Sequence, residues 1–176
     1  PVPCVSLCPA KVDIPGYIAL VGEGRYADAV RLIRKDNPFP TTCGYICEHP
    51  CEARCRRNMV DDSINIRGLK RVAADFSGKV PPPKCAKSTG KKVAVVGLSS
   101  AYFLQLMGHQ VTVYEMLPKL GGMLRYGIPN YRLPKEQLDK DIEAILETGV
   151  EVKHGLRIGE DITVQSLREQ YDAVLI

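Results

Sequence analysis

Apolar side chains in the first part of the chain recur at the spacing of α-helices. Within residues 25–37 (RYADAVRLIRKDN) they fall on one helical face, and the Asn37-Pro38 pair predicts the end of that helix. Residues 64–76 repeat the pattern and predict another helix. We therefore expect residues 1–78 to form a domain of short helices.

From residue 92 onward the pattern changes to alternating strands and helices. The apolar run VAVV predicts a strand that is buried on both faces, as in a parallel sheet. The expected elements, in chain order, are a strand at 92–97, a helix at 98–107, a strand at 111–115, a helix that opens at Pro134 and closes at Gly149, a strand at 150–152, a helix at 164–170 capped by Thr163, and a strand at 172–176. Because the last strand ends on the final residue, we do not expect Ile176 to be a natural terminus.

Residues 79–91 (VPPPKCAKSTGKK) separate these two patterns. Three consecutive prolines among polar and basic residues predict a linker. The predicted fold class is α plus α/β, with a helical domain at residues 1–78, a linker at 79–91 and an incomplete Rossmann-like domain at 92–176.

Composition and charge exclude some classes of protein. The chain has 176 residues, of which 45% are apolar and 25% charged, as in ordinary globular proteins. Its net charge of +4 is too small to indicate nucleic-acid binding, because Lys and Arg are interleaved with acids. No apolar run approaches the roughly 18 residues of a membrane span, and no signal peptide is recognisable. We expect a cytoplasmic protein.

Cysteine is the unusual part of the composition, with six of seven residues lying before position 56. An odd number without a secretion signal disfavours a disulfide scaffold and favours metal or cluster ligation. Cys43, Cys47, Cys51 and Cys55 recur at every fourth position. A single helix would hold the outer two about 18 Å apart, too far for one site. Pro50 predicts a break that leaves Cys47 in a loop, with Cys51 and Cys55 on one helical face.

Cys4 and Cys8 form another pair, in the run CVSLCP. A proline directly after the last cysteine also occurs in ferredoxin-type cluster runs. An iron–sulfur cluster is the favoured interpretation; structural zinc, and inert thiols or disulfides, remain open. His49 is expected in a surface loop and Cys85 as a free thiol. Five basic residues could either offset the charge of a cluster or form a solvated face: Arg54, Arg56, Arg57, Lys70 and Arg71.

The segment 92–115 has the layout of a dinucleotide-binding βαβ unit. In such units a glycine-rich turn contacts the pyrophosphate, and an acid at the end of the next strand binds the ribose. Glu115 stands at the position of that acid, whereas the turn is reduced to Gly97. Gly121 and Gly122, in the irregular stretch 119–134, would allow close approach of the backbone to a ring or phosphate.

Several segments together resemble the N-terminal part of the glutamate synthase small-subunit family. They are CVSLCPAKVDIPGYI, NPFPTTCGYICEHPCEARCRR, INIRGLKRVAADF, KKVAVVG with LSSAYFLQLMGHQVTVYE, and LGGMLRYGIPNYRLP. That family is similar to the flavin portion of dihydropyrimidine dehydrogenase and to flavoprotein subunits of electron-bifurcating NAD(P)H complexes. The resemblance covers essentially the whole chain.

The resemblance implies an oxidoreductase: a helical domain with two [4Fe–4S] clusters, then an FAD domain interrupted by an NAD(P)H domain. Electrons would pass between NAD(P)H, FAD and the clusters to a redox partner subunit, for example one like the glutamate synthase large subunit. No catalytic side chain is expected. The matching positions imply Cys4, Cys8, Cys47, Cys51 and Cys55 as cluster ligands, with Cys43 ranked lower, and Gly97, Glu115, Gly121, Gly122, Met123, Arg132 and the backbone of Ile158 as FAD contacts.

The chain departs from the family pattern at three places. It begins after the Cys-x-x-Cys pair that relatives carry upstream of Cys4. Lys70 stands where some relatives use Gln or Glu as a cluster ligand. Relatives also have a Ser-Gly-Pro-Ala-Gly type of segment between Gly97 and Leu98.

We therefore expect a mobile loop to be missing after Gly97, with a Cα–Cα distance to Leu98 well above the about 3.8 Å of a trans peptide. A normal peptide bond would instead indicate a deletion and argue against FAD binding. The alternative function is a non-enzymatic electron-relay or zinc-binding module with a degenerate nucleotide-binding domain.

Overall fold

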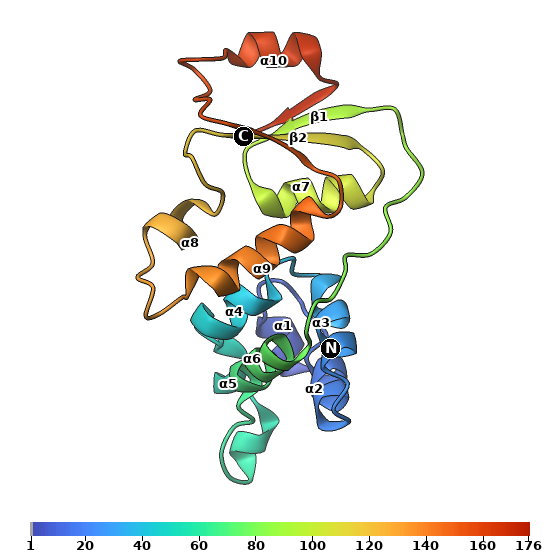
Figure 1. Ribbon diagram of the computed structural model, residues 1–176. Coiled ribbons are helices and arrows are strands. Elements are labelled where there is room, and N and C mark those ends of the chain that lie inside the picture. Colours follow the sequence, from blue (N-terminus) through green and yellow to red (C-terminus); the bar gives the residue numbers. More distant parts are fainter. Residues whose placement is uncertain (1) are drawn as a thin grey trace. The chain divides into compact units, whose positions relative to one another are not determined.

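The computed structural model describes residues 2–176 and divides the chain into two compact units (Figure 1). The first comprises Pro1–Val80 and Asn130–Asp141, and the second comprises Pro81–Pro129 and Ile142–Ile176. Among the described residues, no helix has both the length and the apolar character that crossing a membrane would require. The fold class predicted from the sequence is confirmed: a helical N-terminal part is followed by a small parallel α/β part.

The first unit is built from short helices around one apolar core. They are α1 (Pro3–Leu7), α2 (Ile14–Gly22), α3 (Tyr26–Arg34), α4 (Pro40–Ile46), α5 (Pro50–Ala53), the 3₁₀ helix η1 (Arg56–Met59) and α6 (Ile66–Phe76). Both helices predicted from apolar spacing exist, as α3 and α6. The side chains of Asp13 and Asn65 cap α2 and α6 by accepting the N–H of Gly16 and Gly68. Helix α6 packs against α2, α3 and α4, and α1 packs against α5.

The second unit contains a four-stranded parallel sheet in the order β3-β2-β1-β4. Its elements are β1 (Lys92–Val95), α7 (Leu98–Leu106), β2 (Gln110–Glu115), α8 (Gly122–Tyr126), β3 (Glu151–His154), α10 (Val164–Gln170) and β4 (Ala173–Leu175); α9 (Lys135–Leu146) begins in the first unit. Thr163 caps α10 as predicted, since its hydroxyl accepts the Ser166 N–H at 3.1 Å. Helices α7 and α10 cover opposite faces of this sheet (Figure 1).

The proline-rich segment after Val80 is attached to the α/β unit. Ala86 N donates to Leu106 O at 2.8 Å, and Thr89 N donates to Gly108 O at 3.0 Å. Gly108 has φ of +89°, and a Cβ there would collide with the carbonyl oxygen of Lys87. Glycine at position 108 therefore lets this segment run directly against the end of α7.

The expected chain break after Gly97 is wrong. Gly97 is the N-cap of α7, and Ala101 N donates to Gly97 O at 3.3 Å, the hydrogen bond of a regular first helical turn. Gly97 and Leu98 are thus bonded neighbours, and the phosphate-binding turn of this chain is short.

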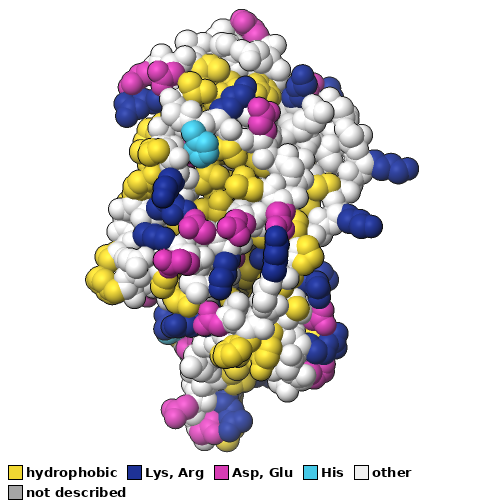
Figure 2. All heavy atoms as spheres, in the orientation of Figure 1, with side chains coloured by type: hydrophobic (Ala, Val, Ile, Leu, Met, Phe, Trp, Pro, Cys, Tyr) yellow, Lys and Arg dark blue, Asp and Glu magenta, His cyan; other side chains and the backbone are white. Residues whose placement is uncertain are grey.

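Charged side chains of both signs are mixed on the surface. On the face drawn in Figure 2, Lys and Arg alternate with Asp and Glu, and no broad area carries one sign alone.

Candidate iron–sulfur centre

Six of the seven cysteines form three pairs with similar local geometry. In each pair the first cysteine lies in a short helix, and the second follows four positions later at or just beyond the helix end. The pairs are Cys4 and Cys8 on α1, Cys43 and Cys47 on α4, and Cys51 and Cys55 on α5. The second cysteine always has an extended backbone, with ψ of 121° at Cys8, 136° at Cys47 and 129° at Cys55. Each pair therefore consists of a helical first cysteine and an extended second cysteine.

The prediction that Cys51 and Cys55 share a helix needs a correction. Helix α5 ends at Ala53, and Cys55 lies beyond its C-cap. The reason is the side chain of Asn58, whose amide donates to the carbonyl oxygens of Glu52 and Ala53 at 3.0 and 3.5 Å. These two bonds satisfy the last carbonyls of α5 and end it one turn early.

The buried side chain of Tyr17 marks the position around which thiols gather. Its hydroxyl donates to Ile66 O at 3.0 Å. Burial raises the pKa of Tyr17, and the neighbouring thiols raise it further; in order of effect these are Cys51, Cys8, Cys4 and Cys47. Cys51 belongs to the core of this unit, while Cys4 and Cys8 pack against that core. Thiols from α1, α4 and α5 therefore lie within electrostatic reach of one buried side chain.

Cys43 and Cys85 differ from these four thiols. The side-chain amide of Asn37 donates to Cys43 Sγ at 3.0 Å. Burial raises the pKa of Cys43, whereas the Asn37 hydrogen bond and the Lys70 ammonium group lower it. Cys85 is an exposed free thiol, as expected, with its Sγ 3.5 Å from Thr148 O.

The five basic residues of this region separate into two kinds. Arg54, Arg56, Arg57 and Arg71 are exposed and form the solvated face that was one of the two expectations. Lys70 is buried on α6, with its ammonium group 5.8 Å from the centre of the Tyr17 ring. Only Lys70, among these five, has the burial that lets a charge act strongly on the thiols.

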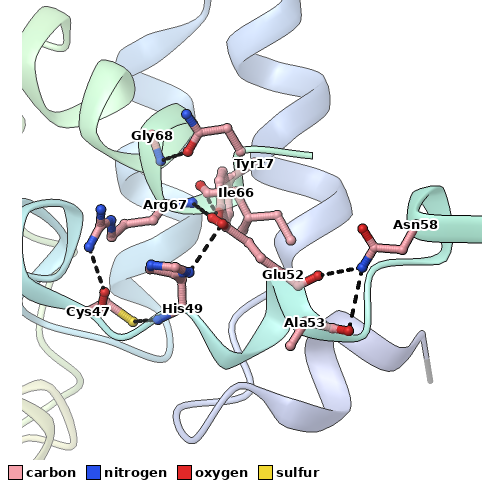
Figure 3. A network of polar contacts seen from close by, with 10 residues as sticks. Tyr17, Cys47, His49, Glu52, Ala53, Asn58, Ile66, Arg67 and Gly68 are labelled. Atoms are coloured by element: carbon pink, nitrogen blue, oxygen red, sulfur yellow. Dashed lines mark hydrogen bonds and ion pairs between the residues drawn. The ribbon is translucent and has the colours of Figure 1, made fainter. Parts of the chain in front are cut away.

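A polar network holds the loop between α4 and α5 against the start of α6 (Figure 3). The Arg67 guanidinium donates to Cys47 O at 3.1 Å, and Arg67 N donates to a carboxylate oxygen of Glu52 at 2.9 Å. Through these two bonds α6 fixes the backbone at Cys47 and the position of α5. The network thereby positions Cys47 relative to Cys51.

His49 contributes its backbone to this network. It has φ of +43°, a left-handed conformation that is strained for a side-chain-bearing residue. In this conformation its N–H points at Cys47 Sγ, 3.3 Å away (Figure 3). Its Nδ1 lies 3.2 Å from Glu52, so the imidazole is an ion-pair partner of that carboxylate when protonated. His49 therefore supplies a hydrogen-bond donor to a thiol.

All seven cysteines are free thiols. Among residues 2–176, no three His, Cys, Asp or Glu side chains converge closely enough to share one metal ion. A cubane cluster needs a wider arrangement, because each thiolate binds a different iron atom. The four thiols whose charge acts on Tyr17 are the candidates for such an arrangement.

The nucleotide residues lie at the carboxyl edge of the sheet. Strands β1 and β2 pair with Val95 opposite Val113, and continuing this register brings Gly97 next to Glu115. One carboxylate oxygen of Glu115 accepts the Leu117 N–H at 2.9 Å, which leaves the other oxygen for a ligand. Gly97 has φ of +135° and open space at its Cβ position. An acid and one glycine at this edge fit a ribose, but a single glycine before Leu98 does not make a pyrophosphate cradle.

The other residues matched to FAD contacts are dispersed. Gly121 and Gly122 open the five-residue helix α8, with φ of +117° and +46°, and Met123 beside them is exposed. Ile158 packs on the α10 side of the sheet. Arg132 belongs to the helical unit, where its guanidinium pairs with Glu48 at 3.1 Å. The structure thus brings Gly97 and Glu115 together and leaves Arg132 engaged elsewhere.

The sequence did not indicate that the charged side chains of Arg34, Lys70 and Asp141 would be buried. Lys70 lies one turn after Ile66 and one turn before Ala73, on the apolar stripe of α6. Asp141 occupies the same kind of position on α9, between Leu138 and Ile145. For Lys70 and Asp141, burial could have been predicted from the position of a charged residue within the apolar stripe of its helix.

Comparison with known proteins identifies the helical unit. Residues 1–80 match the family model of dihydropyrimidine dehydrogenase domain II, 4Fe–4S cluster. The chain is 44% identical over 184 positions to the NADPH-Fe(3+) oxidoreductase subunit beta of Geobacter sulfurreducens, covering 99% of this chain and 27% of that protein. It is 41% identical to the NADP(+)-dependent formate dehydrogenase subunit beta of Moorella thermoacetica, covering 99% of this chain and 29% of that protein. It is 38% identical to the glutamate synthase [NADPH] small chain of Bacillus subtilis, covering 97% of this chain and 36% of that protein.

The helical unit is therefore a 4Fe–4S cluster domain of the dihydropyrimidine dehydrogenase type. The chain as a whole corresponds to the N-terminal region of the family that contains the glutamate synthase small chain and the NADPH-Fe(3+) oxidoreductase β subunit, as its segments indicated. It spans between 27% and 36% of the length of these three relatives. The Geobacter alignment runs over 184 positions against 176 residues in this chain, so that relative has at least 184 − 176 = 8 residues without a counterpart here.

Proposed function

We propose that this chain is part of an iron–sulfur flavoprotein oxidoreductase that transfers electrons between NAD(P)H, FAD and [4Fe–4S] clusters to a partner subunit. The observation that carries the proposal is the set of four thiols around Tyr17 inside the matched cluster domain. The relatives are named as NADPH- or NADP(+)-dependent enzymes and as a β subunit or a small chain. These names support a nicotinamide electron donor and a redox partner subunit, for example one like the glutamate synthase large subunit.

We assign the cluster ligands to five cysteines, namely Cys4, Cys8, Cys47, Cys51 and Cys55. When bound, a [4Fe–4S] cluster supplies a one-electron carrier whose potential depends on hydrogen bonds and charge around its sulfurs. In this chain the His49 N–H donates to Cys47 Sγ, and the Lys70 ammonium lies near Cys51. Cys43 ranks below the other five, because it is not among the thiols whose charge acts on Tyr17 and relatives often lack a cysteine there.

The α/β unit fits FAD only in part. Glu115 fits the ribose, and Gly121, Gly122 and Met123 are available to the flavin nucleotide, with Arg132 and Ile158 as further proposed contacts. The single glycine of the turn does not fit the pyrophosphate, since Leu98 begins α7 immediately. The place of FAD in the proposal therefore rests on the family resemblance, and no residue of this turn is assigned to the pyrophosphate.

The short turn favours a second candidate function. In it, residues 1–80 relay electrons while the α/β unit binds no flavin, so this chain would be a non-enzymatic module. Its zinc-binding version has no comparable support, because the matched family model describes a 4Fe–4S cluster.

Metal analysis and a visible spectrum of the full chain, purified without oxygen, distinguish these functions. The main proposal predicts iron and acid-labile sulfide together with flavin absorption near about 450 nm. Iron and sulfide without flavin bands would support the relay module instead. Zinc without iron would contradict both assignments of a cluster.

A further inference from the structure

The helical unit contains a buried lysine that has no acidic partner. Lys70 is 7% exposed. Within residues 2–176, its ammonium group has no carboxylate within 4.0 Å and no hydrogen bond; its neighbours are the Tyr17 ring and nearby thiols. Burying an unpaired cation is costly, so stable proteins almost always provide it with a counter-charge. No carboxylate of the described residues lies close enough to Lys70 to be that counter-charge.

The Lys70 charge acts on two thiols, those of Cys51 and Cys43. Burial raises the pKa of Cys51, and the charges of Cys47 and Glu52 raise it further, whereas the Lys70 ammonium lowers it. Lys70 acts on Cys43 in the same direction. The cation is therefore in electrostatic contact with thiols of both α4 and α5.

The other buried ionisable group near these thiols is already engaged. Asp141 is fully buried, and its carboxylate accepts the backbone N–H groups of Thr41 and Thr42 at 3.3 and 2.7 Å. Its charge is thus taken up by the first turn of α4. A different source of negative charge must balance Lys70.

We propose that Lys70 is the internal counter-ion of a [4Fe–4S] cluster held by Cys47, Cys51 and their neighbouring thiols, and that its positive charge raises the reduction potential of that cluster. The inference rests on the proposed function, because thiolate-bound clusters are anionic. Reduction adds one electron, and hence one more negative charge, to the cluster. A cation fixed in a medium of low dielectric stabilises the reduced form more than the oxidised form. An ammonium group has only donors and no lone pair, so it does not ligate iron.

The four exposed arginines of this region define the contrast. Arg54, Arg56, Arg57 and Arg71 face solvent, where water and salt screen their charge. Only Lys70, of these five cations, is shielded from that screening. Charge at position 70 should therefore affect the cluster, whereas charge on the surface should not.

A potentiometric titration followed by electron paramagnetic resonance tests the proposal on the full chain, with dithionite as reductant. Three variants are compared with the parent protein: Lys70→Met, Lys70→Arg and, as a matched control, Lys35→Met at the exposed C-cap of α3. At a given potential, Lys70→Met should raise the ratio of oxidised to reduced cluster at least tenfold. For a one-electron couple, this change corresponds to a midpoint potential that is about 59 mV lower. Lys70→Arg and Lys35→Met should leave the midpoint nearly unchanged. If Lys70→Met gives no soluble protein, Lys70→Gln, also uncharged, makes the same comparison.

Other outcomes overturn the proposal in recognisable ways. An unchanged midpoint in both uncharged variants would show that the charge has no effect on the cluster. A changed cluster type, with loss of one iron atom and a new resonance signal, would show that Lys70 ligates iron as a neutral amine. Absence of iron and sulfide from the parent protein would contradict the cluster itself, and with it the proposed function, before any variant is compared.

Discussion

The backbone N–H of Thr42 donates a hydrogen bond to Asp141 Oδ2 at 2.7 Å, across 99 residues of sequence. The N–H of Thr41 reaches the other carboxylate oxygen at 3.3 Å. Both donors belong to the first turn of α4, whose N–H groups have no partner within the helix. Helix α4 carries Cys43 and has Cys47 as its C-cap, so a carboxylate from α9 fixes the helix that leads to the proposed ligand Cys47.

Replacing Asp141 with Leu should destabilise the helical unit. Two buried N–H groups would lose their acceptors, and each unsatisfied group costs roughly 1–3 kcal/mol. Urea unfolding of Asp141→Leu and of the parent chain measures the difference in the free energy of unfolding. Asp141→Asn keeps one acceptor oxygen and should fall between them; equal stability of the Leu variant and the parent would contradict this role of Asp141.

The charge of Asp141 predicts a pH dependence of stability. Burial raises the pKa of Asp141, although hydrogen bonds from Thr42 and Thr41 act in the opposite direction. A carboxyl group whose pKa is raised on folding contributes stability that is fully present below its ordinary pKa and is lost as pH rises through the raised value. As pH rises above about 4, the ordinary pKa of an aspartic acid, the parent should therefore lose stability relative to Asp141→Asn. A free-energy difference that stays constant over this range would contradict the prediction.

Single cysteine substitutions should separate ligands from other thiols. Cys47→Ser and Cys51→Ser should each remove or alter one cluster, with a loss of up to about four iron atoms per chain. Cys85→Ser is the matched control, because Cys85 is exposed and remote in sequence from the three pairs. Cys43→Ser should retain the iron content of the parent. Iron and sulfide assays after anaerobic purification give the comparison. A loss of iron in Cys43→Ser would show that Cys43 is a cluster ligand.

Glu52 should matter through the bond that it accepts from α6. Its carboxylate receives Arg67 N at 2.9 Å and is 16% exposed. Glu52→Ala removes this acceptor and should cost roughly 1–2 kcal/mol of stability, with faster bleaching of the cluster in air. Glu52→Gln keeps an acceptor oxygen and should be milder. Identical bleaching rates in both variants would show that the Arg67 contact does not hold the loop at Cys47.

The turn after Gly97 permits a gain-of-function experiment. Inserting Ser-Gly-Pro-Ala-Gly between Gly97 and Leu98 restores glycines where the backbone must approach a phosphate. We expect the inserted chain to bind FAD more tightly than the parent, as measured by flavin fluorescence quenching. Adding Glu115→Ala to the inserted chain should reverse the gain, since the ribose loses its acidic partner. No gain on insertion would mean that the turn is not what limits flavin binding.

Much of the fold could be predicted from apolar spacing. Helices α3 and α6, the strands β1 and β2 and the capped helix α10 lie within three residues of their expected bounds. The end of α5 could not be predicted, because it depends on the Asn58 side chain folding back onto two carbonyl groups. The bond between Gly97 and Leu98 was also missed, since the family resemblance predicted a longer turn than this chain has.

The sequence by itself determined the spacing of the cysteines, the helices α3 and α6 and the parallel sheet, because helical spacing and strand alternation are local properties of the chain. Tertiary structure alone decided that Lys70 is buried among thiols while its four arginine neighbours are solvated, and that Asp141 caps a helix 99 residues away. Burial of a charge depends on which elements pack over it, and that packing joins distant segments. The energetic cost of such burial makes Lys70 the residue most closely tied to the charge of a bound cluster.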